Sequence, residues 1–297
     1  MQESCCNVCF RACRLKEGQT GACFARICRD GEVRPLNYGH LTSLALDPIG
    51  KKPLARFMPG AKILSAGSFG CNLKCPFCQN CEISCAGMTD GQVFFADAQG
   101  MVHRIPVTIC TPEELCAEAV FQKENGNVGV AYTYNEPLVG YEYVRDCAMT
   151  VHKAGMVNVL VTAGCVTQEV QAEILPYIDA MNIDLKSFRA SFYRDLVGGD
   201  LDMVRSFIET AVCDETTHVE LTCLIIPGEN DTEEEMEEMA SWIASLDGGK
   251  GKEVPLHVSR FFPRHRMSDR APTPVETVYR LAEVASGHLR YVYTGNC

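Results

Sequence analysis

From about residue 62 onward, short apolar runs alternate with longer segments whose apolar positions recur at helical spacing. Short apolar runs rich in β-branched residues and bounded by turn residues predict buried strands. The longer segments between them predict helices. The predicted strands are Ile63–Ala66, Val128–Thr133, Val157–Val161, Met181–Leu185, Val219–Ile226 and Leu256–Phe262.

Three of the predicted helices carry signals for their first turn. Thr111-Pro112-Glu113-Glu114 offers an N-cap threonine, a proline at the first helical position and a glutamate placed for a capping box. Thr273-Pro274-Val275-Glu276 has the same arrangement. Asp231–Glu235 places several acids at the positive end of another helix.

This alternation of strands and helices predicts a parallel sheet covered by helices. Six strands are too few to close an eight-stranded barrel. The sequence therefore predicts an α/β fold, a partial (β/α)6 barrel of the TIM type, over residues 61–297. In such folds the chemistry lies at the carboxyl ends of the strands.

Residues 1–60 have a different character, being rich in Cys, Arg and Gly and lacking a long periodic segment. The chain holds 18 cysteines, of which six lie in the first 28 residues and five lie between Cys71 and Cys85. In a long chain without a secretory signal, such clusters indicate metal or iron–sulfur ligation more than disulfides. We therefore predict a small, metal-stapled N-terminal module.

The charge pattern limits the possible partners. Lys and Arg number 27 and Asp and Glu number 38, which gives a net charge of −11. An acidic chain is a poor ligand for nucleic acid or an anionic membrane. No apolar run reaches the roughly 18 residues of a membrane span, and Met1–Cys5 shows no signal-peptide pattern. These features predict a cytoplasmic protein that binds neither nucleic acid nor membrane.

The most specific motif is Cys71-x3-Cys75-x2-Cys78, which directly follows the first predicted strand. Closely spaced thiolates on one loop can wrap an iron–sulfur cluster. Three thiolates on a [4Fe–4S] cluster leave one iron open, and the amino and carboxylate groups of S-adenosylmethionine (SAM) can chelate it. An electron from the cluster can then cleave SAM and release a 5′-deoxyadenosyl radical. Zinc remains an alternative, because Cys81 or Cys85 could supply the fourth ligand of a closed structural site.

Several motifs together resemble a known family. The residues are Gly70–Asn80, Asp47-Pro48-Ile49, Lys51–Leu54, Pro59-Gly60 and the ending Tyr291–Asn296. They resemble the radical SAM member of the AmmeMemoRadiSam system, which is similar to pyruvate formate-lyase activating enzymes. The likeness covers nearly the whole chain. Gly50 stands where that family usually has Glu and Cys81 where an aromatic is usual, and neither is one of the three expected cluster ligands.

The resemblance implies a set of SAM contacts at the strand ends. Phe77 and Asn80 belong to the cluster loop. Tyr134-Asn135-Glu136-Pro137 resembles the Gly-Gly-Glu-Pro element, in which the glutamate accepts hydrogen bonds from the SAM amino group. Asp184-Leu185-Lys186 resembles the Asp-x-Lys motif, whose lysine would pair with the SAM carboxylate. The remaining implied contacts are Thr162, in a Thr-Asn-Gly-like segment, and His265, which would reach the ribose. Each of these short segments also fits an ordinary turn or a solvated surface.

The N-terminal cysteines form a second candidate site. Cys6-x2-Cys9-x3-Cys13 and Cys23 match a recurrent pattern of the same family, with Cys5 and Cys28 as spare candidates. Four thiolates could close a structural zinc site or hold a second [4Fe–4S] cluster. The sequence does not separate these two readings, and unrelated reduced thiols are a third.

Three functions are compatible with the sequence. The first is a radical SAM enzyme that abstracts hydrogen from a small molecule or peptide, with Memo-like and AMMECR-like proteins as partners. The second is an activating enzyme that acts on a glycine of a glycyl-radical enzyme. The third is a non-enzymatic iron–sulfur electron carrier. The first two need an electron donor such as flavodoxin or ferredoxin, and the fold and cofactor do not name the substrate.

Overall fold

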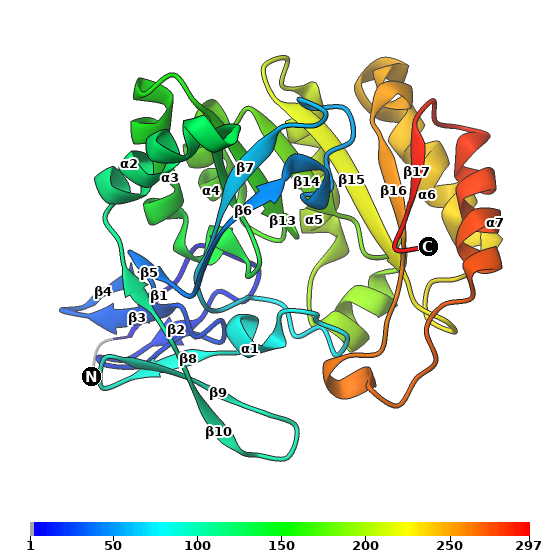
Figure 1. The fold of residues 1–297 in the computed structure, drawn as a ribbon. Coiled ribbons are helices and arrows are strands. Elements are labelled where there is room, and N and C mark those ends of the chain that lie inside the picture. Colours follow the sequence, from blue (N-terminus) through cyan, green and yellow to red (C-terminus); the bar gives the residue numbers. More distant parts are fainter. Residues whose placement is uncertain (1–2) are drawn as a thin grey trace.

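The computed structural model describes residues 3–297, and its centre is one curved, eight-stranded sheet (Figure 1). Seven neighbouring strands run parallel, and only the edge strand β6 is antiparallel to its neighbour. The strands in spatial order are β17 (Val292–Gly295), β16 (Leu256–Arg260), β15 (His218–Ile225), β14 (Ala180–Asp184), β13 (Val157–Thr162), β12 (Asn127–Tyr132), β7 (Lys62–Gly67) and β6 (Ser43–Pro48). The two end strands are not paired, so the barrel stays open.

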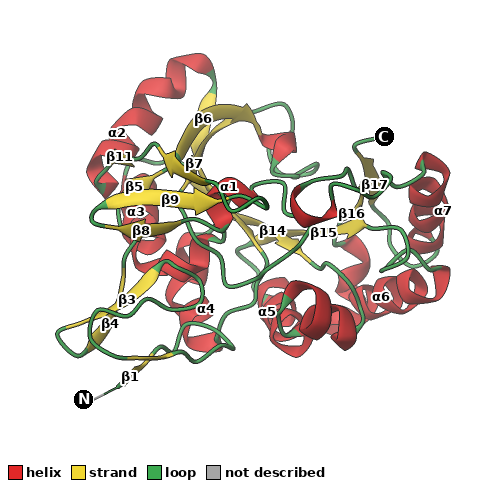
Figure 2. Cartoon of the chain, turned by 90° about the horizontal axis from the view of Figure 1, so that it is seen from below, coloured by secondary structure: helices red, strands yellow, loops and turns green. Residues whose placement is uncertain are grey.

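Helices follow the outer side of this sheet (Figure 2). Their apolar faces and the buried strand residues form one continuous core. The inner side of the sheet is therefore left for the loops at its carboxyl end. The helices are α2 (Pro112–Phe121), α3 (Tyr141–Lys153), α4 (Gln168–Ile174), α5 (Leu201–Cys213), α6 (Glu233–Ser245) and α7 (Val275–Ser286), and a short α1 (Cys81–Ser84) lies in the loop after β7. None of the helices within residues 3–297 is long and apolar enough to cross a membrane.

The six strands predicted from apolar runs are confirmed as β7 and β12 to β16. The parallel strand β17 and the antiparallel strand β6 were not predicted. β17 has only four residues, and β6 has no buried residue in its pattern, so neither gives a continuous apolar run.

The helix-start signals had two outcomes. Thr111 caps α2 and forms a capping box with Glu114, as expected. The same prediction for Thr273 is wrong, because α7 begins at Val275 without a side-chain cap. The Thr273 hydroxyl is buried instead, where it donates to the Ile225 carbonyl and accepts from the Phe261 amide. The hydroxyl thus joins the carboxyl ends of β15 and β16, and this tertiary contact overrides the local signal.

Short antiparallel strands make up the N-terminal region and the segment between β7 and α2. Residues 43–48, which the sequence places in the N-terminal module, form β6 of the large sheet. The hairpin β9–β10 projects away from the sheet in Figure 1. These strands are β1 (Ser4–Cys5), β2 (Arg14–Leu15), β3 (Arg26–Arg29), β4 (Glu32–Pro35), β5 (His40–Leu41), β8 (Gly87–Thr89), β9 (Gln92–Ala96), β10 (Val102–Ile105) and β11 (Thr108–Ile109).

Charged side chains fasten the N-terminal region to the barrel. Arg26 is 4% exposed and donates to both carboxylate oxygens of Glu142 on α3, over 2.9 and 2.8 Å. Arg11 donates to the carbonyls of Asn72 and Gly198. Because Asn72 lies inside the Cys71–Cys78 loop, the N-terminal region directly supports the candidate site.

Candidate functional site

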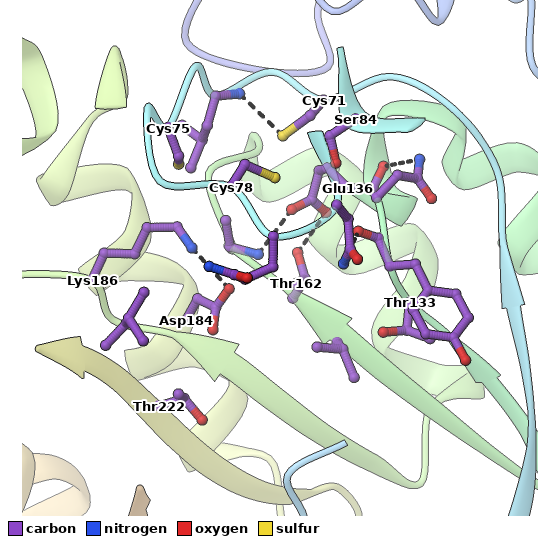
Figure 3. Close-up of a pocket in the computed structure, with 18 of the residues that line it drawn as sticks. Cys71, Cys75, Cys78, Ser84, Thr133, Glu136, Thr162, Asp184, Lys186 and Thr222 are labelled. Carbon is purple, nitrogen blue, oxygen red and sulfur yellow. Dashed lines mark hydrogen bonds and ion pairs between the residues drawn. The ribbon is translucent and has the colours of Figure 1, made fainter. Parts of the chain in front are cut away.

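A cavity of about 330 Å³ lies at the carboxyl ends of the central strands (Figure 3). This volume is within the range of small-molecule sites. The cavity gathers residues from the loop after β7 and from the ends of β12 to β16, together with Asn296 near the C-terminus. Of the residues predicted from the sequence to hold a cluster or SAM here, the lining includes Cys71, Cys75, Phe77, Cys78, Asn80, Tyr134, Asn135, Glu136, Thr162, Asp184 and Lys186.

The three cysteine thiols enter the cavity from one loop. The Leu73 amide donates to Cys71 Sγ over 3.4 Å, and the Cys78 amide donates to the Cys75 carbonyl over 3.2 Å, so the loop curls around the thiols. Burial raises the pKa of Cys71 well above its usual value. Burial also raises the pKa of Cys75 to about 12, against the opposing charge of Lys186. Thiols in such a site become thiolates only when a metal binds them.

The number of thiols at the cavity suits a cluster better than a structural zinc ion. Three cysteines line the cavity. Three thiolates on a [4Fe–4S] cluster leave one iron open for another ligand, whereas a structural zinc ion takes four closed ligands. Cys81 and Cys85, the proposed fourth zinc ligands, do not line the cavity, although they pack in the same apolar cluster as Cys78.

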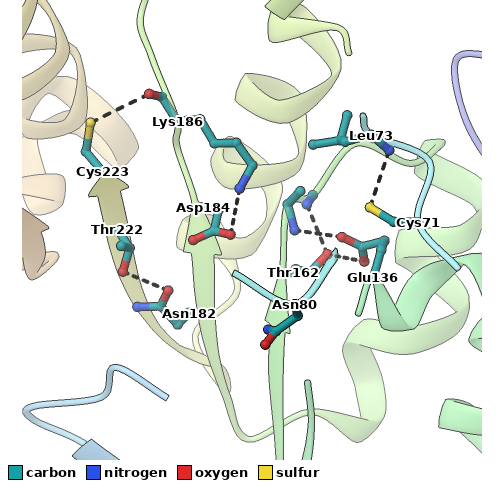
Figure 4. A network of polar contacts seen from close by, with 12 residues as sticks. Cys71, Leu73, Asn80, Glu136, Thr162, Asn182, Asp184, Lys186, Thr222 and Cys223 are labelled. Atoms are coloured by element: carbon teal, nitrogen blue, oxygen red, sulfur yellow. Dashed lines mark hydrogen bonds and ion pairs between the residues drawn. The ribbon is translucent and has the colours of Figure 1, made fainter. Parts of the chain in front are cut away.

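Glu136 anchors one wall of the cavity (Figure 4). Its Oε1 accepts from the Leu138 amide and the Thr162 hydroxyl, over 3.1 and 2.6 Å. Its Oε2 accepts from the Ala163 amide over 2.8 Å. Burial raises the pKa of Glu136, and these three donors oppose that rise. The carboxylate thus fixes the end of β13, and a carboxylate oxygen with one bond retains a free acceptor position.

Asp184 and Lys186 form an ion pair on the opposite wall. Lys186 Nζ lies 2.8 Å from Asp184 Oδ2, and the lysine side chain is 14% exposed. Burial lowers the pKa of Lys186, but the adjacent Asp184 carboxylate outweighs it, and the net pKa is raised. Lys186 is therefore a cation held beside the cysteine loop.

Asp47 and Lys52, from the motifs upstream of the cysteine loop, support the cavity-lining residue Tyr134. Lys52 is buried and donates to Asp47 over 2.8 Å, and the Tyr134 hydroxyl donates to the same carboxylate over 2.5 Å. Burial raises the pKa of Asp47, but these donors outweigh it and lower that pKa to about 2. Tyr134 itself has a left-handed backbone, with a φ of 74°. The network holds Tyr134 in this costly conformation.

Asn135 and Asn80 bond mainly to the backbone. Asn135 accepts from the Ser68 amide and donates to the Phe69 and Gly70 carbonyls, just before the cysteine loop. Asn80 donates to the Tyr134 carbonyl over 2.9 Å. Both side chains therefore tie the β12 end to the cysteine loop.

One predicted residue lies elsewhere. His265 is half-buried in a short 3-10 helix (His265–Met267) and does not line the cavity, although the neighbouring Arg266 amide donates to the Pro76 carbonyl of the cysteine loop. Its contact with ribose stays a prediction. The sequence reasoning singled out none of Ser84, Thr222 and Ser259, which line the cavity, and it named Pro53 only as part of the Lys51–Leu54 motif. Thr222 and Ser259 lie on predicted strands, and only their position near the carboxyl ends marks them.

A cysteine-lined cavity at the carboxyl end of an open (β/α) barrel defines a class of iron–sulfur enzymes. The sequence pattern of the Radical SAM superfamily matches residues 67–243, which contain the cysteine loop, Glu136 and Lys186. This chain belongs to the Radical SAM superfamily. It is accordingly an enzyme whose family works with a [4Fe–4S] cluster and SAM.

Relatives support this placement. Uncharacterized protein MJ0808 of Methanocaldococcus jannaschii is 36% identical over 98% of this chain and 80% of its own length. The 4-hydroxyphenylacetate decarboxylase activating enzyme of Clostridioides difficile is 25% identical over 55% of this chain, which spans 50% of that protein. A radical SAM methyltransferase from Sphaerobacter thermophilus has the same fold, with a TM-score of 0.55 at 14% identity over 91% of this chain and 75% of that one.

Proposed function

We propose that Cys71, Cys75 and Cys78 hold a [4Fe–4S] cluster and that SAM binds in the adjoining cavity. When bound, this pair supplies a 5′-deoxyadenosyl radical that abstracts hydrogen from a substrate. The observation that carries the proposal is that the three thiols line the same cavity as Glu136 and Lys186. The proposed catalytic unit is residues 61–297.

The cavity walls offer complementary charges for an amino acid group. Glu136 presents an acceptor that suits an ammonium group, and Lys186 presents a donor that suits a carboxylate. Charge-assisted hydrogen bonds of this kind are shorter and stronger than neutral ones. Thr162, Asp184, Asn80, Asn135, Phe77 and Tyr134 would complete the SAM site.

Replacing Lys186 with methionine should weaken SAM binding while leaving the iron content unchanged. Losing a charge-assisted hydrogen bond typically costs about 1.5–3 kcal/mol, which is roughly 10- to 150-fold in Kd. Lys74→Met is the matched control, because Lys74 is an exposed lysine of the cysteine loop that does not line the cavity. The Kd is measured anaerobically by equilibrium dialysis. An equal Kd for the Lys186 variant and the wild type would contradict this role.

The substrate class follows from two likenesses. The resemblance to the AmmeMemoRadiSam system favours a small molecule or peptide, with Memo-like and AMMECR-like partner proteins. The similarity to an activating enzyme favours a glycine of a glycyl-radical enzyme as an alternative. Both need a low-potential electron donor such as flavodoxin or ferredoxin.

A partner assay separates these two substrates. The reduced, cluster-loaded protein is incubated with SAM and either the Memo-like and AMMECR-like proteins or a glycyl-radical enzyme. The first reading predicts that the Memo-like and AMMECR-like pair increases 5′-deoxyadenosine formation. The second predicts a glycyl radical signal in electron paramagnetic resonance (EPR). The small-molecule or peptide substrate would be overturned by a glycyl radical signal together with no change in 5′-deoxyadenosine formation when the Memo-like and AMMECR-like proteins are added.

A further inference from the structure

Thiols make up much of the buried core at the start of the chain. Seven apolar residues in 3–31 are buried, and four of them are cysteines: Cys6, Val8, Cys9, Leu15, Cys23, Ala25 and Cys28. The strands β1 and β2 in this segment have only two residues each. So small a region gains little stability from apolar burial, and a bound metal is the usual substitute.

Cys6, Cys9, Cys13 and Cys23 lie near one another. The Cys6 amide donates to the Cys13 carbonyl over 2.9 Å. A side chain at Gly21 would touch both Cys13 Sγ and Cys23 Sγ, at 3.7 and 3.9 Å from its Cβ. The Ala12 amide donates to the Cys9 carbonyl over 3.1 Å, so a turn carries the chain from Cys9 to Cys13. These contacts gather the four cysteines in one small region.

A buried cation lies beside these cysteines. The Gly21 amide donates to the Arg26 carbonyl over 2.8 Å, and Arg26 is 4% exposed. Glu142 already pairs with the Arg26 charge, but Arg26 Nε is buried and has no hydrogen-bond partner in the part of the chain that the structure describes. Hydrogen bonds to the sulfurs of an iron–sulfur cluster tune its potential. Arg26 therefore offers a free donor beside the thiols.

Four cysteine thiolates can hold either one zinc ion or a [4Fe–4S] cluster. Zinc has no redox chemistry, so only a cluster could use the contact with the Cys71 loop, described next, to pass electrons.

The two cysteine sets are joined by one hydrogen bond. The Cys71 amide donates to the Cys23 carbonyl over 3.2 Å. The loops approach this closely because residue 70 is glycine, with a φ of 90°, and a Cβ there would lie 2.5 Å from the Cys23 carbonyl oxygen. A path of covalent bonds and a single hydrogen bond thus connects a thiol of one set to a thiol of the other.

We propose that Cys6, Cys9, Cys13 and Cys23 hold a second [4Fe–4S] cluster that relays single electrons to the Cys71 loop. The site itself stands on the N-terminal residues, whereas the relay rests on the proposed radical SAM function. A low-potential one-electron donor of the flavodoxin or ferredoxin class reduces the N-terminal cluster. That cluster is reoxidised when the electron passes along the Cys23–Cys71 contact, so each transfer moves one electron and breaks no bond.

The site is tested in the full chain carrying Cys71→Ala, Cys75→Ala and Cys78→Ala. After anaerobic reconstitution this variant should retain about four irons per chain and give a [4Fe–4S] EPR signal when reduced. Adding Cys9→Ala and Cys13→Ala should remove that iron, whereas adding the matched control Cys28→Ala, a buried cysteine of the same module, should not. Zinc in place of iron, or no metal in the triple variant, would overturn the second cluster. Because this variant lacks the proposed radical SAM ligands, the result does not depend on SAM cleavage.

The relay is tested by magnetic coupling between the two clusters. The fully reduced wild type should give an EPR spectrum broader than the sum of the spectra of the two single-cluster variants. Those variants are Cys71/Cys75/Cys78→Ala and Cys9/Cys13→Ala. A wild-type spectrum equal to that sum would place the clusters too far apart and overturn the relay.

Discussion

Replacing Cys71, Cys75 or Cys78 with alanine is expected to reduce SAM cleavage below detection. Each variant leaves only two protein thiolates for the cluster at the cavity, and all three thiols line that cavity. The measurement is 5′-deoxyadenosine formed by the anaerobically reconstituted protein with dithionite and SAM. Iron at the N-terminal site should persist, so total iron should fall by about half rather than to zero.

Cys81→Ala and Cys85→Ala are the matched controls for this prediction. Both cysteines follow the loop closely in sequence and pack with Phe69 and Cys78, but neither lines the cavity. They should keep wild-type iron content and SAM cleavage. Loss of metal in these controls, with zinc in the wild type, would favour the closed zinc site instead.

Replacing Glu142 with alanine should destabilise the folded chain by about 3 kcal/mol, because it leaves a buried charge without its partner. Arg26 is almost fully buried and donates twice to Glu142, and its side chain joins the N-terminal region to α3. The measurement is chemical unfolding of the full chain, with the same metal content in each sample.

Glu173→Ala is the control for this prediction. Glu173 pairs with Arg145 over 2.9 Å, but Glu173 is exposed and Arg145 is only half-buried. Exposed pairs of this kind contribute about 0–1 kcal/mol. Equal unfolding free energies for the Glu142 and Glu173 variants would show that the Arg26 pair does not hold the N-terminal region in place.

The strands that could be predicted are those buried on both faces. β7 and β12 to β16 read as apolar runs because helices cover one side and the cavity loops cover the other. β6 and β17 lie at the edges of the open sheet, where partial exposure removes that signal. Thr273 shows the opposite case, in which a good local signal gives a wrong prediction. Its hydroxyl bonds to Phe261 and Ile225 at the ends of two strands and so does not cap α7.

The residues of the candidate site also divide into those that the sequence reveals and those that only the fold brings together. Cys71, Cys75 and Cys78 could be found because one loop supplies them at close sequence spacing. Glu136 and Lys186 could be found only through short motifs placed at strand ends. Ser259 reaches the cavity because the sheet brings the end of β16 beside the other strand ends, and no local pattern carries that information. The contacts that place Asp47 and Lys52 behind Tyr134 are likewise tertiary, although their motif was visible in the sequence.

Reductant-dependent SAM cleavage by the wild-type chain tests the central claim most directly. The protein is reconstituted anaerobically until its iron content is constant, and 5′-deoxyadenosine is then measured with SAM, with and without dithionite. The account predicts that 5′-deoxyadenosine forms only when the reductant is present and that Lys186→Met needs more SAM to reach the same rate. Iron-loaded wild-type protein that binds SAM and forms no 5′-deoxyadenosine under reduction, with or without the candidate partner proteins, would contradict it.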